Sequence, residues 1–170
     1  MKNITFLALA AFMTLSCSDD DKTSAMPSIQ GTYKLTSFRT NQVFDFNNDG
    51  MATEDFLTES GCYANSTVVL GTDNSSVINL GNSGIDYVIP PDTNQFTYVV
   101  TCAELDAFAG EYSQSGNDVI ITMNDEPYVF AKSGNTLSVI MHNIIYTPVN
   151  QPGGQVYYTV SDATLVFTKQ

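Results

Sequence analysis

The most constraining feature of this sequence is a series of short runs, from residue 31 onward, that are rich in β-branched and aromatic residues. Gly, Asn, Asp and Pro separate these runs at fairly regular intervals, a pattern typical of strands joined by tight turns. One segment, residues 104–108 (ELDAF), is predicted to form a helical turn instead. The predicted strands are residues 32–39, 66–70, 77–80, 96–102, 110–114, 118–123, 128–132, 137–142, 155–160 and 164–169.

Turn chemistry and side-chain alternation support the strand prediction. Gly116-Asn117 and Gly134-Asn135 can supply the positive φ values that tight hairpins require. Apolar residues alternate along residues 119–123 and 137–141, which predicts one buried face for each strand. The alternation is interrupted by Ile120 and Ile140. A closed barrel with bulges, or a patch buried against another surface, would explain the interruption.

The length and composition favour one β-rich domain. The chain has 170 residues, 43% of them hydrophobic, with 9 Tyr and 10 Phe, enough to bury a continuous core. About ten strands in this length predict an all-β fold, a single antiparallel β-barrel, because closure removes exposed strand edges. A β-sandwich is the alternative. The net charge of -12, from 18 acidic and 6 basic residues, excludes nucleic acid as a partner of any basic face.

The N-terminal residues 1–16 have the features of a secretory signal peptide. Lys2 gives a positive start, and residues 4–15 (ITFLALAAFMTL) form an apolar stretch. Twelve helical residues rise only about 18 Å, which is too short for a hydrocarbon core of about 30 Å. An ordinary secreted protein that is cleaved at another position is the alternative.

The end of this stretch resembles the lipobox of bacterial lipoproteins. A small residue, Ser16, precedes Cys17, and the sequence CSDDD that follows resembles lipoproteins of the Bacteroidota. The resemblance implies acylation of Cys17 and export to the outer membrane, exposed at the cell surface. By themselves, three adjacent carboxylates indicate only a solvated segment. Residues 17–28 are therefore predicted to be the lipidated cysteine and a flexible acidic linker.

Residues 29–170 resemble a lipocalin-like domain. The segment Gly31-Thr32-Tyr33-Lys34-Leu35 looks like the GxW opening strand of lipocalins, with Tyr33 where Trp is usual. The closing segment 164–169 (TLVFTK) is similar to the last strand of lipocalin-like domains in Bacteroidota lipoproteins. The resemblance implies a barrel that serves as a non-enzymatic binding or accessory module. The expected ligand is a small apolar molecule or a glycan.

The cysteine count predicts one disulfide. Lipidation of Cys17 leaves the pair Cys62 and Cys102, which can bond in an oxidising, exported setting. Closing this segment of about 40 residues would contribute about 4 kcal/mol in the loop-entropy model. A zinc site is a weak alternative, because one His and two separated Cys lack zinc spacing.

Residues 45–55 (DFNNDGMATED) have the D-x-N-x-D-G spacing of calcium-binding loops. Calcium takes six to eight oxygen ligands, roughly, and alternate side chains of a tight loop converge on one point. The sequence predicts a structural calcium ion here, although an Asx-rich turn without an ion is the alternative. The candidate ligands are the side chains of Asp45, Asn47 and Asp49, the carbonyl of Met51, and a closing carboxylate from Glu54 or Asp55.

No nucleophile or acid–base motif is present in the sequence, so we predict that the protein is not an enzyme. His142 is the only histidine and has no Ser or Cys nucleophile motif beside it. Two other functions stay open: a structural or adhesive surface domain that binds another protein, and a hydrolase of surface glycans. A hydrolase would need two carboxylates facing one cleft, roughly 5 to 10 Å apart.

Overall fold

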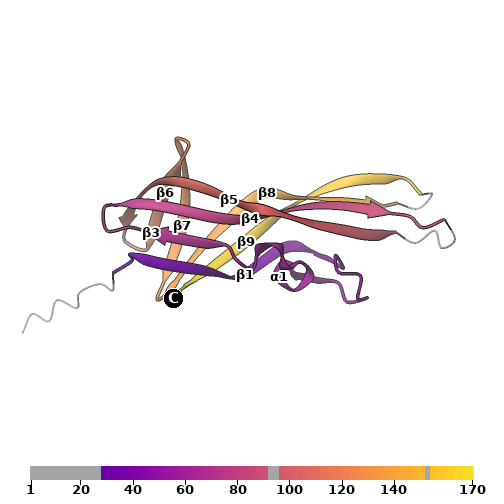
Figure 1. The fold of residues 1–170 in the computed structure, drawn as a ribbon, viewed down its shortest axis with the longest axis horizontal. Helices are drawn as coiled ribbons and strands as arrows, with labels where there is room; N and C mark the ends of the chain where they lie inside the picture. The colour runs from indigo at the N-terminus through magenta and orange to yellow at the C-terminus, as the bar shows by residue number, and fades with distance from the viewer. Residues whose placement is uncertain (1–27, 92–95, 152–153) are drawn as a thin grey trace, which may run out of the picture.

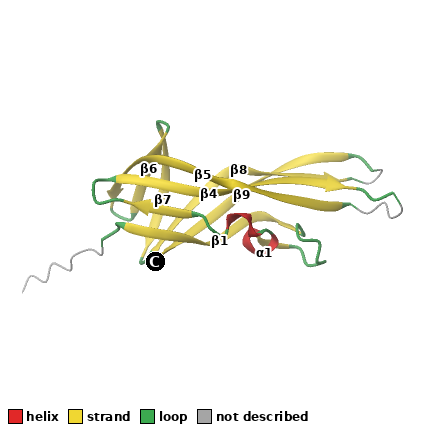
Figure 2. Cartoon of the chain, in the orientation of Figure 1, coloured by secondary structure: helices red, strands yellow, loops and turns green. Residues whose placement is uncertain are grey.

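The computed structural model describes residues 28–91, 96–151 and 154–170 of the chain. Within these residues the chain forms nine strands and two short helices (Figures 1 and 2). The predicted signal peptide, the predicted lipidation site Cys17 and the predicted linker up to residue 27 lie outside the described residues. In chain order the elements are β1 (Gly31–Phe44), β2 (Thr53–Asp55), α1 (Phe56–Glu59), η1 (Gly61–Tyr63), β3 (Thr67–Leu70), β4 (Ser75–Val88), β5 (Thr97–Ser115), β6 (Asp118–Met123), β7 (Glu126–Ser133), β8 (Thr136–Asn150) and β9 (Val156–Lys169).

The strands form a closed antiparallel barrel. From β3 to β9 each strand pairs with its neighbours in sequence, and β1 pairs with β3 along one edge and with β9 along the other. This closes eight strands into a barrel, and β2 is an extra strand that pairs with the later part of β1. The predicted all-β fold is confirmed, and the architecture is the barrel rather than the alternative sandwich.

The barrel core comes from the alternating positions that the sequence indicated. Val119, Ile121, Leu137 and Val139 are buried in the interior, because side chains of successive strand residues point to opposite faces of the sheet. Tyr33, at the position where the lipocalin resemblance places tryptophan, is also buried and donates its hydroxyl hydrogen to the carbonyl of Ile29 at 2.8 Å. The hydrophobic pattern therefore specifies which face of each strand lines the barrel.

The predicted helical turn at residues 104–108 is wrong. These residues lie within β5, which is 19 residues long and pairs with β4 from Val88↔Thr97 to Ser75↔Glu111. A single turn of helix is marginal in water, whereas a long cross-strand ladder gives each residue a backbone partner. Pairing with a long neighbouring strand, β8, likewise joins the predicted strands at 155–160 and 164–169 into one strand, β9.

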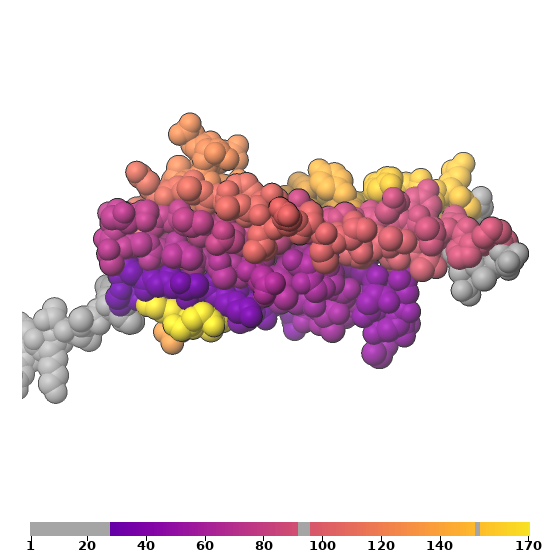
Figure 3. All heavy atoms as spheres, viewed as in Figure 1, coloured from indigo at the N-terminus to yellow at the C-terminus, as the bar shows by residue number. Residues whose placement is uncertain are grey.

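Two long hairpins, β4–β5 and β8–β9, extend beyond the barrel in the same direction (Figure 1). They give the molecule the elongated body seen in the space-filling view (Figure 3). α1 lies beside the base of these hairpins, next to β1 (Figure 1), and β2 pairs with β1. The barrel therefore lies at one end of the molecule, and the two hairpins extend to the other end.

A cluster of aromatic rings packs where α1, η1 and the acidic segment 45–50 meet the barrel. Neighbouring rings have centroids 4.7–5.3 Å apart, with mostly tilted or edge-to-face geometry. Such pairs add about 0.5–1.5 kcal/mol each beyond the burial of their area. The rings are those of Phe38, Phe44, Phe46, Phe56, Tyr63 and Tyr98, and we call them the aromatic cluster.

Candidate functional site: a barrel cavity and an acidic loop

A cavity of about 160 Å³ lies within the barrel, and strands β4 to β9 all contribute to its wall. Most of the lining is aliphatic or aromatic, and the polar groups come from the β6–β7 hairpin. The lining residues are Ile78, Leu80, Phe108, Met123, Asn124, Glu126, Tyr128, Phe130, Val139, Met141, Leu165 and Phe167. An interior of this kind suits an apolar ligand with one polar end.

The barrel wall is split beside this cavity. β7 pairs with β6 along the whole of β6, from Asp118↔Ala131 to Met123↔Glu126. By contrast, the described ladder between β7 and β8 has three residue pairs and ends at Ala131↔Ser138. Past that pair the two strands diverge. Val129 of β7 and Ile140 of β8 are 55% and 60% exposed and line one groove on the outside of the split.

The β6–β7 turn holds the polar groups at the cavity rim. Asn124 and Asp125 form a two-residue turn with φ values of 51° and 66°, which Asn and Asp tolerate better than most residues. Glu126 and Tyr128 follow, and the Tyr128 hydroxyl donates to the Glu126 carboxylate at 3.3 Å. Burial and the charge of Glu126 both raise the pKa of Tyr128. The tyrosine therefore stays a neutral hydrogen-bond donor at the rim.

The acidic loop comprises residues 45–52, between β1 and β2. Three candidate calcium ligands in it, Asp45, Asn47 and Asp49, accept hydrogen bonds from the loop's own backbone. The two carboxylate oxygens of Asp45 accept from the N–H groups of Asp49 (3.0 Å) and Gly50 (2.9 Å). The Asn47 side-chain oxygen also accepts from the N–H of Asp49, at 3.0 Å. Asp49 in turn accepts from the N–H of Met51 at 2.8 Å. These are the hydrogen bonds of an Asx-rich turn, and each carboxylate oxygen keeps a further lone pair.

The two proposed closing ligands lie apart from this turn. Asp55 caps α1, where its carboxylate accepts from the N–H of Leu57 at 3.1 Å. Glu54 is exposed on β2, outside the turn's hydrogen bonds. No group of three or more His, Cys, Asp or Glu side chains placed to hold a metal ion occurs within the described residues. Calcium coordination would therefore depend on amide, carbonyl and water oxygens beside the carboxylates.

Two residues that sequence reasoning missed fix the acidic loop in place. Glu59, buried at the end of α1, accepts from the N–H of Phe46 at 2.9 Å and of Asn47 at 3.3 Å. Burial raises the pKa of Glu59, and the charges of Asp45 and Asp49 add to the effect. The side chain of Asn48 bonds both backbone groups of Tyr98 on β5, at 3.0 Å each. The residues beside Glu59 in sequence, Leu57, Thr58 and Ser60, carry no pattern that would have indicated its contact with the loop.

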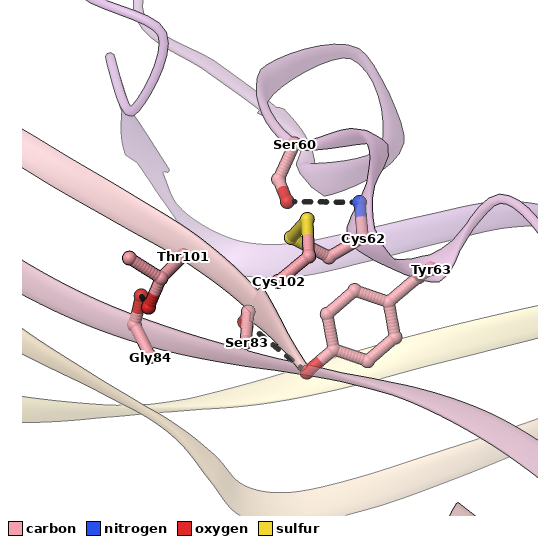
Figure 4. The surroundings of a disulfide bond; sticks show 7 residues. All are labelled: Ser60, Cys62, Tyr63, Ser83, Gly84, Thr101 and Cys102. Carbon is pink, nitrogen blue, oxygen red and sulfur yellow. Dashed lines mark hydrogen bonds between the residues drawn. A yellow bond between two sulfur atoms is a disulfide. The ribbon is translucent and has the colours of Figure 1, made fainter. Parts of the chain in front are cut away.

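The predicted disulfide is confirmed. Cys62 lies in η1 and Cys102 in β5, with their Cα atoms 5.0 Å apart (Figure 4). The Cys62 N–H bonds the Ser60 hydroxyl at 3.2 Å, which caps η1, and Ser83 of β4 bonds the Tyr63 hydroxyl at 3.4 Å (Figure 4). The bond therefore ties the helical segment to the β4–β5 hairpin.

His142 belongs to a bulge in β8. Its ring lies 2.9 Å from the carboxylate of Asp162, which also accepts from the N–H of Asn143 at 2.9 Å. The β8–β9 ladder shifts register between Met141 and Ile145 at this point. The Asn143 N–H and, after it, His142 lower the pKa of Asp162. The pair holds a bulge on an exposed surface, since the His142 side chain is 71% exposed.

Comparisons of this chain with protein families, with curated proteins and with solved structures find no match. Across the described ranges, no helix is long and apolar enough to cross a membrane. A functional assignment therefore depends on the residues and geometry above.

Proposed function

We propose that this protein is a lipocalin-like lipoprotein of the cell envelope, and that its barrel binds a small apolar ligand without catalysing a reaction. The observation that carries this proposal is the apolar cavity of about 160 Å³ inside the barrel. An apolar cavity of about 150 Å³ is large enough to take up a benzene-sized molecule. The ligand class is therefore a small ring or a short alkyl chain.

An apolar ligand fits this cavity better than a glycan. Each buried sugar hydroxyl would need a hydrogen-bond partner, and an unpaired one costs about 1–3 kcal/mol. Within the lining, such partners are concentrated at one rim, in Asn124, Glu126 and Tyr128. The interior beyond them is hydrocarbon and aromatic. It can accommodate an alkyl chain or ring without leaving polar groups unpaired.

Among the described residues, the cavity lining does not offer the carboxylate pair that a glycan hydrolase would need. Glu126 is the one acid in this described lining, whereas glycoside hydrolysis uses two carboxylates across the scissile bond. His142 and Asp162 lie outside this lining. This supports a binding module rather than an enzyme.

The anchor is proposed from the sequence at residues 16–21, where a small residue, a cysteine and three aspartates follow the apolar stretch. Several acyl chains on Cys17 would hold the protein at the outer membrane, since one chain binds a membrane only marginally. Labelled fatty acid should enter the wild type and not Cys17→Ala. Label in the variant would contradict the anchor and leave the cavity proposal standing.

A structural calcium ion at the acidic loop belongs to the same proposal. Asp45, Asn47 and Asp49 direct side-chain oxygens at one turn, and calcium prefers oxygen ligands of this kind. Such an ion would stiffen the first connection of the barrel.

Binding of benzene tests the cavity. Benzene should raise the melting temperature of the wild type, because a ligand that binds only the folded state stabilises it. Val139→Phe should fill the cavity and remove this response, since Val139 is buried and lines it. Val129→Phe is the matched control on the exposed side of the split and should keep the response. A wild type that benzene does not stabilise would contradict the proposal.

One observation favours a second function, adhesion to another protein. The two long hairpins expose large apolar side chains, and exposed patches of this kind mark interaction surfaces. These side chains are Val88, Ile89, Val99 and Leu105 on or next to β4–β5, and Tyr146, Tyr157, Tyr158 and Val160 on β8–β9. A photoreactive residue at position 158 should then cross-link a specific partner on intact cells. The same residue at the exposed position 43 of β1 should not.

A further inference from the structure

We propose that the barrel cavity selects amphiphiles with a cationic or neutral head group and discriminates against those with a carboxylate head. This inference rests on the proposed function, because it specifies the ligand class of the same cavity. It is carried by the placement of charge around the cavity rim.

The lining fixes the orientation of an amphiphile. Val139, Phe130 and Phe167 are buried in the apolar interior. Asn124 and Glu126 are exposed at the β6–β7 hairpin, where the polar lining is found. An alkyl chain in the cavity would therefore direct its head group toward this hairpin, because burying the head in the interior would leave it without partners.

Glu126 is held at this position by the hairpin. The Asn124-Asp125 turn is two residues long, and Met123 and Glu126 form the first cross-strand pair after it. The hydroxyl of Tyr128 bonds the Glu126 carboxylate at 3.3 Å. Asp125 adds a second carboxylate to the same turn. A ligand head group at the rim would therefore meet fixed negative charge.

No cation of the described chain lines the cavity to offset this charge. Lys34 and Arg39 lie on β1 and Lys132 on β7, and none of the three is among the lining residues. Lys169 of β9 donates instead to the carbonyl of Ser28, and His142 pairs with Asp162. The chain as a whole has a net charge of -12. Both the local and the overall charge therefore oppose a carboxylate and attract an ammonium group.

The aromatic residues of the lining favour a cation further. Tyr128 at the rim and Phe108 both line the cavity, and the face of an aromatic ring attracts an ammonium group within roughly 6 Å. A carboxylate gains nothing from the same faces. The expected order of affinity is hexylammonium, then 1-hexanol, then hexanoate.

Calorimetric titration of the full chain with these three compounds tests the inference, because they share one alkyl chain and differ in head charge. Hexanoate should bind about fivefold more weakly than 1-hexanol, the ratio that two unit charges about 4 Å apart in water produce. Glu126→Gln should bring the three affinities closer together and leave that of 1-hexanol unchanged. Glu111→Gln is the matched control. It removes the same charge from an exposed position on β5, beside the inward-facing Tyr112, and should keep the wild-type order.

The outcomes separate this inference from the proposed function. If 1-hexanol binds and hexanoate binds as tightly, or if Glu126→Gln leaves their ratio unchanged, the charge selection is overturned and the apolar site stands. If Glu111→Gln shifts the ratio as much as Glu126→Gln, the net charge acts rather than the rim, and the inference also fails. If none of the three compounds binds, both proposals fail.

Discussion

The two sides of the barrel are held together in different ways. On the side we call the stapled side, α1 and η1 are joined to β1 and β5 by the Cys62–Cys102 disulfide and by the aromatic cluster. On the split side, formed by β6, β7 and β8, the ladder between β7 and β8 has three described residue pairs, and a cavity lies behind it.

This difference indicates how the chain can be stable and still admit a ligand. The disulfide and the packed rings on the stapled side resist opening without any contribution from the split side. Regions with few shared hydrogen bonds and exposed apolar residues open at lower free energy than the rest of a protein. A small apolar molecule could then enter beside β7 and β8 while the remaining ladders stay closed.

The largest expected effect is the loss of a ring from the aromatic cluster. Phe56→Ala should lower the free energy of unfolding by about 3–5 kcal/mol, because the ring is buried and contacts three other rings. Phe130→Ala on the split side should cost less. Phe130 borders an existing cavity, and its ring is paired with Phe167 at a longer centroid distance of 6.3 Å. Urea unfolding of both variants measures the two losses in free energy of unfolding. Equal losses would contradict the difference between the two sides.

Loss of the disulfide should have the next largest effect. The bond joins residues 40 apart in sequence, so the double variant Cys62→Ala, Cys102→Ala should lose up to about 4 kcal/mol. A reductant should destabilise the wild type by a similar amount and leave the double variant unchanged. Benzene should raise the melting temperature of the double variant by about as much as that of the wild type, since neither cysteine lines the cavity. Loss of that response with the fold intact would show that the two sides are coupled.

The barrel itself could be predicted from sequence, because its strands follow the alternation of side chains. Val119, Ile121 and Leu137 were placed on a buried face by period alone, and the structure buries all three. The cysteine pair was predicted from an even count. Residues 104–108 misled the prediction because their local composition favours a helix, while the long ladder of β4 and β5 imposes a strand.

The ligand site could not be predicted, because a cavity depends on where strands diverge. No feature of the sequences of β7 and β8 indicates that their ladder ends at Ala131↔Ser138. The role of Glu59 was hidden for a similar reason. It lies 12 and 13 residues from the backbone groups that it binds, in a contact formed only once α1 packs on the barrel.

The third prediction concerns a calcium ion bound on the stapled side. If calcium binds the loop at Asp45, Asn47 and Asp49 in the folded state only, a hundredfold excess over Kd should stabilise the protein by about 2.7 kcal/mol. Magnesium should do less, because it demands rigid octahedral geometry and keeps its waters. The double change Asp45→Ala, Asp49→Ala should abolish the response. A chelator-treated wild type whose melting curve is unmoved by calcium would leave this segment as an Asx-rich turn.

The smallest expected effect concerns the β8 bulge beside the split. The Asn143 N–H, and after it His142, hold the pKa of Asp162 below its ordinary value in the folded protein. The unfolded chain therefore binds this proton more readily than the folded chain does. The carboxylate contributes stability at a pH above its ordinary pKa, and this contribution is lost as the pH falls through the lower, folded value. Because Asp162 is exposed, the contribution is small.

Asp162→Asn isolates this contribution, since the amide oxygen can still accept from the Asn143 N–H while the charge is gone. Urea unfolding of both proteins over a range of pH gives the difference in their stabilities. That difference should shrink toward zero as the pH falls through the lowered, folded pKa of Asp162, because the other carboxylates titrate equally in both proteins. A difference that stays constant into acid would mean that the bulge depends on the hydrogen bond alone. The split side would then be insensitive to the charge of Asp162.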